Sequence, residues 1–264
     1  MSARCEGSRH RRCYAEPASW HGTRVALEAE ERHHLCRVLR AKRGDRVVVF
    51  DGQGREADAR LENEREGVLE IAGEPRRSEQ PSCRMILMQA IPKRRGMDAI
   101  VEKATELGAA ELLPVVSERT VARPDVEKGD ACVARWRRIA TNAARQCGAV
   151  WTPCVREVLP FAAALSEMAC TDALFLGCTD SGCAPVLAAA ETAALRFSAT
   201  VGLMIGPEGD WTDGEVERAK AAGAIPVGFG PLVLRVETAA LFGLSVLAAR
   251  FAHDFGSREP NRQS

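Results

Sequence analysis

The residues best suited to chemistry gather in one glycine-rich stretch, residues 201–244. Two apolar runs in this stretch each lead into a glycine turn, at residues 206–209 and 228–230. Glycine allows the backbone to turn tightly and to approach a ligand closely. An apolar run, a glycine turn and then a helix form a pattern typical of the ligand-binding edge of an α/β sheet.

The first turn, GPEGD at residues 206–210, does not have the sequence of a phosphate loop. It matches neither GxGxxG nor GxxxxGK[ST], and its two carboxylates would repel a pyrophosphate. Thr212 and Glu215 have the spacing of a capping box, so the helix satisfies its own first amides. Acidic groups favour a cationic ligand, and exposed glycine backbone can bond a neutral base. One interpretation is an adenosine carrying a positive sulfonium; the other is that the glycines only make tight turns.

Composition sets broad limits on the class of protein. A chain of 264 residues forms one or two domains. No apolar run reaches the roughly 20 residues of a membrane span, and the charged N-terminus lacks the apolar core of a secretion signal. We therefore expect a cytoplasmic protein. The ten cysteines form no CxxC pair, and Cys178 and Cys183 lack companion histidines, so we expect reduced thiols and no metal.

Basic residues are clustered although the net charge is zero. Residues 32–46 hold six Lys or Arg against one acid, residues 93–95 are all basic, and residues 135–145 contain four arginines. Each cluster alone could be a solvated face. Three clusters together favour binding to an anionic polymer such as RNA.

The order of predicted elements divides the chain into two domains. Residues 1–75 contain short alternating runs and glycine turns, which predict a small β-barrel with one helix near residues 30–39. A polar linker with prolines follows at residues 74–82. Residues 82–255 alternate apolar strands with amphipathic helices, which predicts a parallel α/β sheet. Pro114, inside one predicted strand, indicates an edge or a position that donates no ladder bond. The tail, residues 256–264, is expected to be disordered.

The glycine-rich stretch resembles a known family. IGPEGDWTDGE followed by GFGPLVLRVETAAL is similar to the signature of SPOUT-type methyltransferases. Within them it resembles the 16S ribosomal RNA uridine-N3 methyltransferase family (RsmE type). MDAIVEKATELGAAELLPVVSERTV, RWRRIATNAARQCG and HHLCRVLRAKRGDRVVVFDGQG also match, in family order and over most of the chain.

The resemblance implies a PUA-like β-barrel RNA-binding domain before an α/β domain whose C-terminal chain is threaded into a trefoil knot. Periodicity alone could not indicate such threading. The family also implies a homodimer that binds S-adenosylmethionine in the knot. By motif match, the cofactor-binding residues are Leu176, Gly177, Ile205, Gly206, Pro207, Glu208, Gly209, Gly228, Phe229, Gly230, Leu232, Val233 and Leu234.

The implied reaction is methyl transfer to N3 of a uridine in 16S rRNA, in the decoding region of the small subunit. Arg235 and Glu237 match the family's R-x-E-T segment and are the expected catalytic residues. Arg235 would stabilise charge on the uracil oxygens, or form a salt bridge to Glu237 or Glu208. Glu237 would take the N3 proton, orient Arg235, or interact with a helix N-terminus.

The RNA itself is expected to meet a set of basic side chains. The residues expected to contact it are Arg12, Arg37, Arg40, Arg43, Lys93 and Arg94. His33 and His34 are expected to face RNA or to be structural. Two other functions stay open: methylation of a ribose hydroxyl, and a non-catalytic factor in ribosomal RNA assembly.

Three residues depart from the family pattern. Asp210 replaces the usual second glycine after GPEG, Ala149 replaces a common arginine, and Arg145 stands where an acid is usual. The first is expected to reshape the cofactor loop, and the other two to alter an RNA contact.

Overall fold

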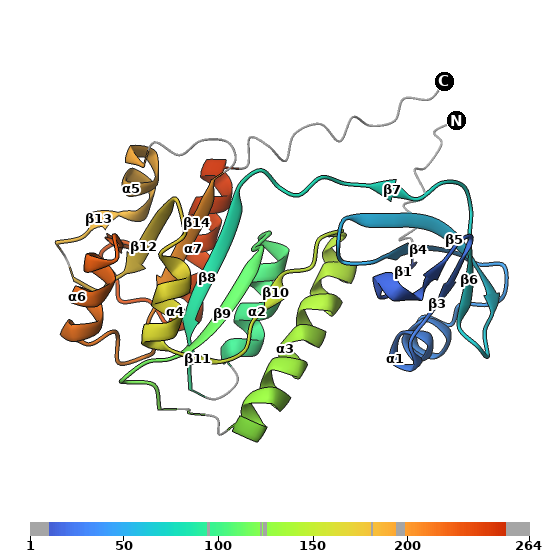
Figure 1. Ribbon diagram of the computed structural model, residues 1–264, viewed down its shortest axis with the longest axis horizontal. Coiled ribbons are helices and arrows are strands. Elements are labelled where there is room, and N and C mark those ends of the chain that lie inside the picture. Colours follow the sequence, from blue (N-terminus) through green and yellow to red (C-terminus); the bar gives the residue numbers. More distant parts are fainter. Residues whose placement is uncertain are drawn as a thin grey trace, which may run out of the picture. The chain divides into compact units, whose positions relative to one another are not determined.

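The computed structural model describes residues 11–93, 96–121, 123, 126–180, 182–193 and 199–251 (Figure 1). The chain divides into two compact units. Residues 1–80 together with 144–152 form the first, and residues 81–143 together with 153–264 form the second. In sequence, residues 144–152 lie between the two segments that form the second unit. They nevertheless belong to the first unit.

A mostly antiparallel sheet builds the first unit, in the order β1-β4-β5-β6-β3-β2 with β7 beside β5. Along β5, alternate residues Ala57, Ala59 and Leu61 are buried, as expected for a strand with one face on a core. The described strands are β1 (Arg11–Tyr14), β2 (Trp20–His21), β3 (Arg24–Ala26), β4 (Arg46–Phe50), β5 (Arg55–Asn63), β6 (Val68–Ile71) and β7 (Arg76–Arg77).

The helix predicted near residues 30–39 is confirmed. A short turn, η1 (Pro17–Ser19), precedes it, and the helix itself comprises α1 (Ala29–His33) and a π-helical turn, η2 (His34–Val38). It inserts Leu35 fully into the core of the first unit. Arg40 follows in a left-handed conformation, with φ 53°, which ends the helical path.

Arg145 forms a nearly buried ion pair with Glu31 within the first unit. Its Nη1 lies 2.8 and 3.0 Å from the two carboxylate oxygens of Glu31 in α1. The side chains are only 13% and 11% exposed, and Glu31 also accepts the Tyr14 N–H at 3.2 Å. A charge removed from water needs such partners. The arginine that departs from the family pattern therefore has a structural partner within this unit.

A parallel sheet organises the second unit, in the order β10-β9-β8-β14-β12-β15-β13 with β11 beside β9 (Figure 1). The strands are β8 (Arg84–Ala90), β9 (Glu111–Val116), β10 (Cys154–Val155), β11 (Leu159–Pro160), β12 (Ala173–Gly177), β13 (Ala184–Pro185), β14 (Thr200–Ile205) and β15 (Ile225–Gly228). The helices are α2 (Gly96–Glu106), α3 (Val126–Cys147), α4 (Phe161–Met168), α5 (Val186–Thr192), α6 (Asp213–Ala221) and α7 (Val236–Phe251).

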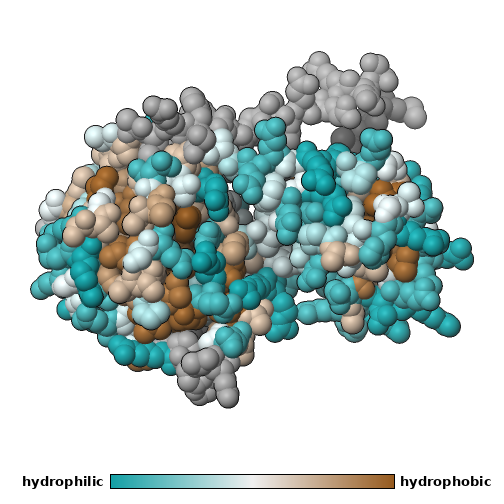
Figure 2. Space-filling view, viewed as in Figure 1, coloured by the Kyte–Doolittle hydropathy of each residue, from teal (hydrophilic) through white to brown (hydrophobic). Residues whose placement is uncertain are grey.

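Helices cover both faces of this sheet, which confirms the predicted α/β architecture. One hydrophobic core joins the sheet to α2, α3, α5 and α7, and a second joins it to α4 and α6. On the face drawn in Figure 2, the second unit also carries a broad area of hydrophobic surface. The trefoil threading of the C-terminal chain stays a prediction.

Pro114 does not mark a sheet edge. Its strand, β9, lies between β8 and the two short strands β10 and β11. On the outer side, β10 pairs with residues 111–112 and β11 with residues 115–116. Pro114 falls in the gap between them, where a missing N–H breaks no pairing. Of the two expectations for Pro114, the second is therefore right.

Further expectations concern membranes, thiols and metals. In the described part of the chain, no helix is both long and apolar enough to cross a bilayer. Among the described residues, Cys13, Cys36, Cys132, Cys147, Cys154, Cys170, Cys178 and Cys183 are free thiols. The described residues also contain no cluster of three His, Cys, Asp or Glu that would hold a metal ion.

We predict that Glu31→Ala destabilises the first unit by about 3 kcal/mol, because Arg145 loses its carboxylate partner in a nearly dry environment. Urea unfolding followed by circular dichroism measures the loss. Glu30→Ala is the matched control, since Glu30 is an exposed acid on the same helix. Equal, small effects of the two substitutions would contradict the structural role of the pair.

Candidate functional site

A pocket of about 890 Å³ lies where β12, β14 and β15 end in the second unit. It is lined by the turns that follow these three strands and by Lys93 and Gly96 before and at the start of α2. The expected residues that line it are Gly177, Ile205, Gly206, Pro207, Glu208, Gly228, Phe229, Gly230, Leu232, Val233, Leu234, Arg235 and Glu237. The sequence match therefore converges on one site.

Two expected cofactor residues do not line this pocket. Leu176 is fully buried in the sheet core, and Gly209 is exposed, where an added Cβ would lie 3.4 Å from the Arg119 side chain. The segment after β12 forms a further wall of the pocket, and the family signature does not name its individual residues. That wall includes Cys178, Thr179 and Asp180. The pairing of β12 with β15 brings these residues to the site.

Gly177 is required by close packing at the end of β12. A Cβ at this position would lie 2.8 Å from the Phe229 ring and 3.0 Å from Ile205 Cδ1. Phe229 in turn makes an edge contact with Phe242 of α7, at 6.0 Å between ring centroids. Because residue 177 is glycine, the Phe229 ring can pack closely against the backbone at the end of β12.

Asp210 ties two of the turns together. Its φ of 59° is left-handed, a conformation that Asp tolerates better than most residues. One carboxylate oxygen accepts the Thr179 hydroxyl at 2.7 Å and its N–H at 3.3 Å, and the other accepts the Trp211 N–H at 2.8 Å. The aspartate that replaces the family's glycine therefore gains a hydrogen-bonding role.

Residues that do not line the pocket stabilise the turn after β14. Arg119 donates to the carbonyls of Gly209 and Trp211 at 2.8 and 3.1 Å. The predicted capping box of α6 is confirmed, with Thr212 and Glu215 bonded to each other's backbone N–H. These bonds hold the glycine turn in one shape without using a ligand.

The charged groups of the pocket differ in what they contact. The Lys93 N–H donates to Glu208 Oε1 at 2.7 Å, and the Glu237 carboxylate lies beside Gly96. Arg235 is exposed on the loop between β15 and α7. Within the described chain, no ion pair joins Arg235 to Glu208 or Glu237, so the proposed alternative of a structural salt bridge is absent. Its guanidinium is available to a ligand.

The Cys178 thiol is a poor nucleophile in this site. Burial, and then the neighbouring Cys183 thiol, raise the pKa of Cys178 to about 12. A thiol with so high a pKa stays protonated at neutral pH. Covalent chemistry through Cys178 is therefore disfavoured, and the site contains mainly groups that bind and orient.

The expected RNA-contacting residues fall into two groups. Arg37, Arg40 and Arg43 are exposed in the first unit, and in the part of the chain that the structure describes their side chains make no ion pair. Lys93 is exposed beside the pocket of the second unit. Arg94 lies outside the described residues.

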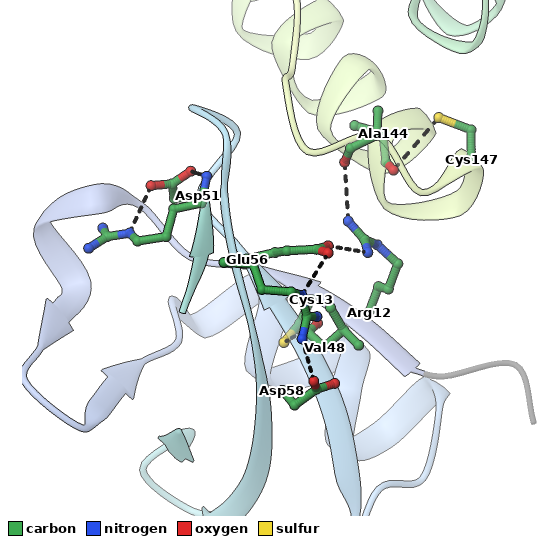
Figure 3. Close-up of polar contacts among 11 residues, drawn as sticks. Arg12, Cys13, Val48, Asp51, Glu56, Asp58, Ala144 and Cys147 are labelled. Carbon is green, nitrogen blue, oxygen red and sulfur yellow. Dashed lines mark hydrogen bonds and ion pairs between the residues drawn. The ribbon is translucent and has the colours of Figure 1, made fainter. Parts of the chain in front are cut away.

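Arg12 makes several contacts within the first unit. Its side chain is only 17% exposed, and Nη1 pairs with Glu56 at 2.9 Å while Nη2 donates to the Ala149 carbonyl at 3.2 Å (Figure 3). The guanidinium also lies over the Phe50 ring. Arg12 therefore helps to hold the first unit together, and its contact with RNA phosphate stays a prediction. Ala149 contributes only its backbone carbonyl to this contact, and any residue type at position 149 would offer the same group.

The chain matches two family models of RNA methyltransferases. A family model described as an RNA methyltransferase domain matches residues 78–248, and one described as an RNA methyltransferase PUA domain matches residues 27–71. The chain is 34% identical to ribosomal RNA small subunit methyltransferase E of Synechocystis, over 85% of this chain and 73% of the relative. It is 30% identical to the Bacillus subtilis protein of the same name, over 84% and 89%.

Solved structures of methyltransferases are also similar to this chain. A putative methyltransferase from Legionella pneumophila, in complex with the cofactor SAM, is 29% identical with a TM-score of 0.80, over 91% of this chain and 98% of that one. A ribosomal RNA small subunit methyltransferase E from Neisseria gonorrhoeae, bound to S-adenosyl methionine, is 28% identical with a TM-score of 0.78, over 91% and 97%.

We predict that Asp210→Ala destabilises the second unit more than Asp210→Gly does. Both variants lose the bonds to Thr179 and Trp211, at about 1 kcal/mol each, but alanine adds roughly 1–2 kcal/mol for its left-handed conformation. Thermal denaturation of the two variants measures the difference. Equal melting temperatures would show that the backbone strain is unimportant.

Proposed function

This chain belongs to the ribosomal RNA small subunit methyltransferase E family, and from that premise we propose that it methylates N3 of a uridine in 16S rRNA, with S-adenosylmethionine as methyl donor. The observation that carries the proposal is the pocket itself. Three glycine-lined turns meet there, and the exposed Arg235 stands at the wall without an ion-pair partner in the described chain.

S-adenosylmethionine fits the pocket by size and by chemistry. The volume of about 890 Å³ lies in the range of small-molecule sites. Backbone at Gly206 and Gly228 can bond the adenine edge, and Phe229 and Leu232 offer apolar surface to the ring. The carboxylates of the site suit a cation. When bound, the cofactor supplies an electrophilic methyl group on its sulfonium.

The side chains of this chain have two tasks at the uridine. N3 lies on the pairing edge of the base and carries a proton, so the base must be unpaired and N3 deprotonated before attack. The site must also hold the base in line and stabilise negative charge on the uracil oxygens. Arg235, a permanent cation at the pocket wall, suits that second role. Glu237 lines the same wall and either takes the proton or positions its neighbours.

RNA binding is assigned mainly to the first unit, whose match to a PUA domain supports that role. Arg37, Arg40 and Arg43 would contact phosphates, and Lys93 would contact RNA beside the pocket. We further propose that the enzyme acts on the small ribosomal subunit in the cytoplasm, as a homodimer. The 76% and 84% exposure of Leu232 and Val233 at the pocket rim supports a covering partner.

We predict that 16S rRNA from cells lacking the gene loses one 3-methyluridine in the decoding region, and that Arg235→Ala fails to restore it. The purified variant should bind S-adenosylmethionine like the wild type but transfer methyl at least about 100-fold more slowly, because the anionic transition state loses its cation. Nucleoside analysis and calorimetry measure the two effects. Loss of a ribose-methylated nucleoside instead, or no loss with no cofactor binding, would replace the proposal with one of its two alternatives.

We predict that RNA binding weakens with salt and that Arg37→Ala with Arg43→Ala lowers the slope of log K against log salt by about 1.5. Each lost phosphate contact removes a released counterion. Arg77→Ala is the control, since Arg77 is an exposed arginine of the first unit outside the cluster. An unchanged slope in the double variant would show that the cluster is a solvated face.

A further inference from the structure

Arg119 reaches the glycine turn after β14 from a segment that does not line the pocket. This segment, residues 117–120, is the outer turn, and it directly follows β9. One nitrogen of Arg119, Nη1, donates to the Gly209 carbonyl at 2.8 Å and to the Trp211 carbonyl at 3.1 Å. Hydrogen bonds from a charged group are stronger than neutral ones. The arginine therefore fixes the backbone at the end of residues 206–210, whose first three residues line the pocket.

The outer turn has a closed backbone that holds Arg119 in place. Its two end residues, Ser117 and Thr120, are only 2% and 3% exposed. The Ser117 N–H donates to Thr120 Oγ1 at 2.9 Å, and the Thr120 N–H donates back to the Ser117 carbonyl at 3.2 Å. Arg119 lies between these two residues, so its backbone is fixed although its side chain is exposed.

Glu215 joins the outer turn to α6, the helix that follows the glycine turn. Its side chain is fully buried. Oε1 accepts the Glu118 N–H at 2.9 Å, and Oε2 accepts the Thr212 N–H at 2.9 Å. A carboxylate removed from water needs such partners. Because Glu118 precedes Arg119 and Thr212 follows Trp211, Glu215 fixes the distance between the base of the arginine and the carbonyls that it binds.

The glycine turn is therefore held from two sides. On the pocket side, the Thr179 hydroxyl donates to Asp210 at 2.7 Å, and on the other side Arg119 binds the carbonyls. Within the turn, the Asp210 N–H donates to the Pro207 carbonyl at 2.9 Å. Neither Arg119 nor Glu215 lines the pocket. A loop that is already ordered loses less entropy when a ligand binds, so it binds that ligand more tightly.

We propose that Arg119 and Glu215 are positioning residues for the cofactor. Together they hold residues 206–210 in the shape that binds it, without touching it. The inference rests on the proposed function for the identity of the ligand, whereas the bonds between the two turns do not depend on it. Charge alone gives the opposite expectation: S-adenosylmethionine carries a net positive charge, so removal of a nearby cation would strengthen its binding.

The first experiment compares Arg119→Ala with Arg218→Ala. Arg218 is also exposed, and it donates to Glu118 Oε1 at 3.0 Å and to the Gly214 carbonyl at 3.1 Å, outside the glycine turn. Calorimetry without RNA should show about tenfold weaker binding of S-adenosylmethionine by Arg119→Ala and wild-type binding by Arg218→Ala. Both melting temperatures should stay within about 4 °C of the wild type. Unchanged or tighter binding by Arg119→Ala, or equal weakening in both variants, overturns the proposal.

A second experiment needs neither cofactor nor RNA. Hydrogen exchange of a peptide that covers residues 206–212 should be about tenfold faster in Arg119→Ala than in the wild type, because the turn opens more often. Exchange in Arg218→Ala should match the wild type. Unchanged exchange in Arg119→Ala refutes the positioning role. If the wild type binds no S-adenosylmethionine, the proposed function fails, whereas the exchange result still decides whether Arg119 holds the turn.

The last experiment tests Glu215 against Thr212. Thr212→Ala removes the hydroxyl that accepts the Glu215 N–H at 3.3 Å but keeps both bonds of the carboxylate. It should lower the melting temperature by about 2–4 °C and leave cofactor affinity near wild type. Glu215→Gln offers one oxygen to two N–H groups, so it should weaken cofactor binding, and Arg119→Ala should weaken it less in that background than alone.

Glu215→Asp, which withdraws the carboxylate by one methylene, takes the place of Glu215→Gln if the latter does not fold. Wild-type cofactor affinity in the Glu215 variant, or an undiminished effect of Arg119→Ala in that background, overturns the role of Glu215.

Discussion

The parallel order of β8, β14, β12 and β15 is the constraint on which the rest of the site depends. Neighbouring parallel strands end at the same edge of a sheet, so turns that are distant in sequence become neighbours there. Backbones approach closely at this edge, and Gly177 leaves space that the Phe229 ring fills. The pocket exists because four chain segments share one small volume.

Within this volume, negative and positive groups have separate uses. Asp210 accepts hydrogen bonds from the turn after β12, and Glu208 accepts one from the turn after β8. Carboxylates that accept backbone N–H groups stiffen the loops that they join. Arg235 makes no such internal ion pair in the described chain. The site thus combines a rigid acidic frame with an accessible cation, which suits a cationic cofactor and an anionic transition state.

Local patterns predicted much of this arrangement, and long-range contacts escaped prediction. The capping box of Thr212 and Glu215 was predictable because both residues lie in one helical turn. The family signature placed most of the pocket lining. By contrast, the pairing of Arg12 with Glu56 escaped prediction, because Glu56 lies on another strand and the sequence around a basic residue does not reveal a distant carboxylate. The bonds from Arg119 to the turn after β14 escaped prediction for the same reason, because Gly209 lies far from Arg119 in sequence.

The pairing of Glu31 with Arg145 has a consequence for how the polypeptide matures. The first unit takes in residues 144–152, so its buried acid lacks its arginine until more than half of the chain has left the ribosome. An N-terminal fragment cut at the linker would carry that acid without its partner. The two units are therefore not modules that recombination can exchange at the linker, because the first unit also needs residues that lie beyond it.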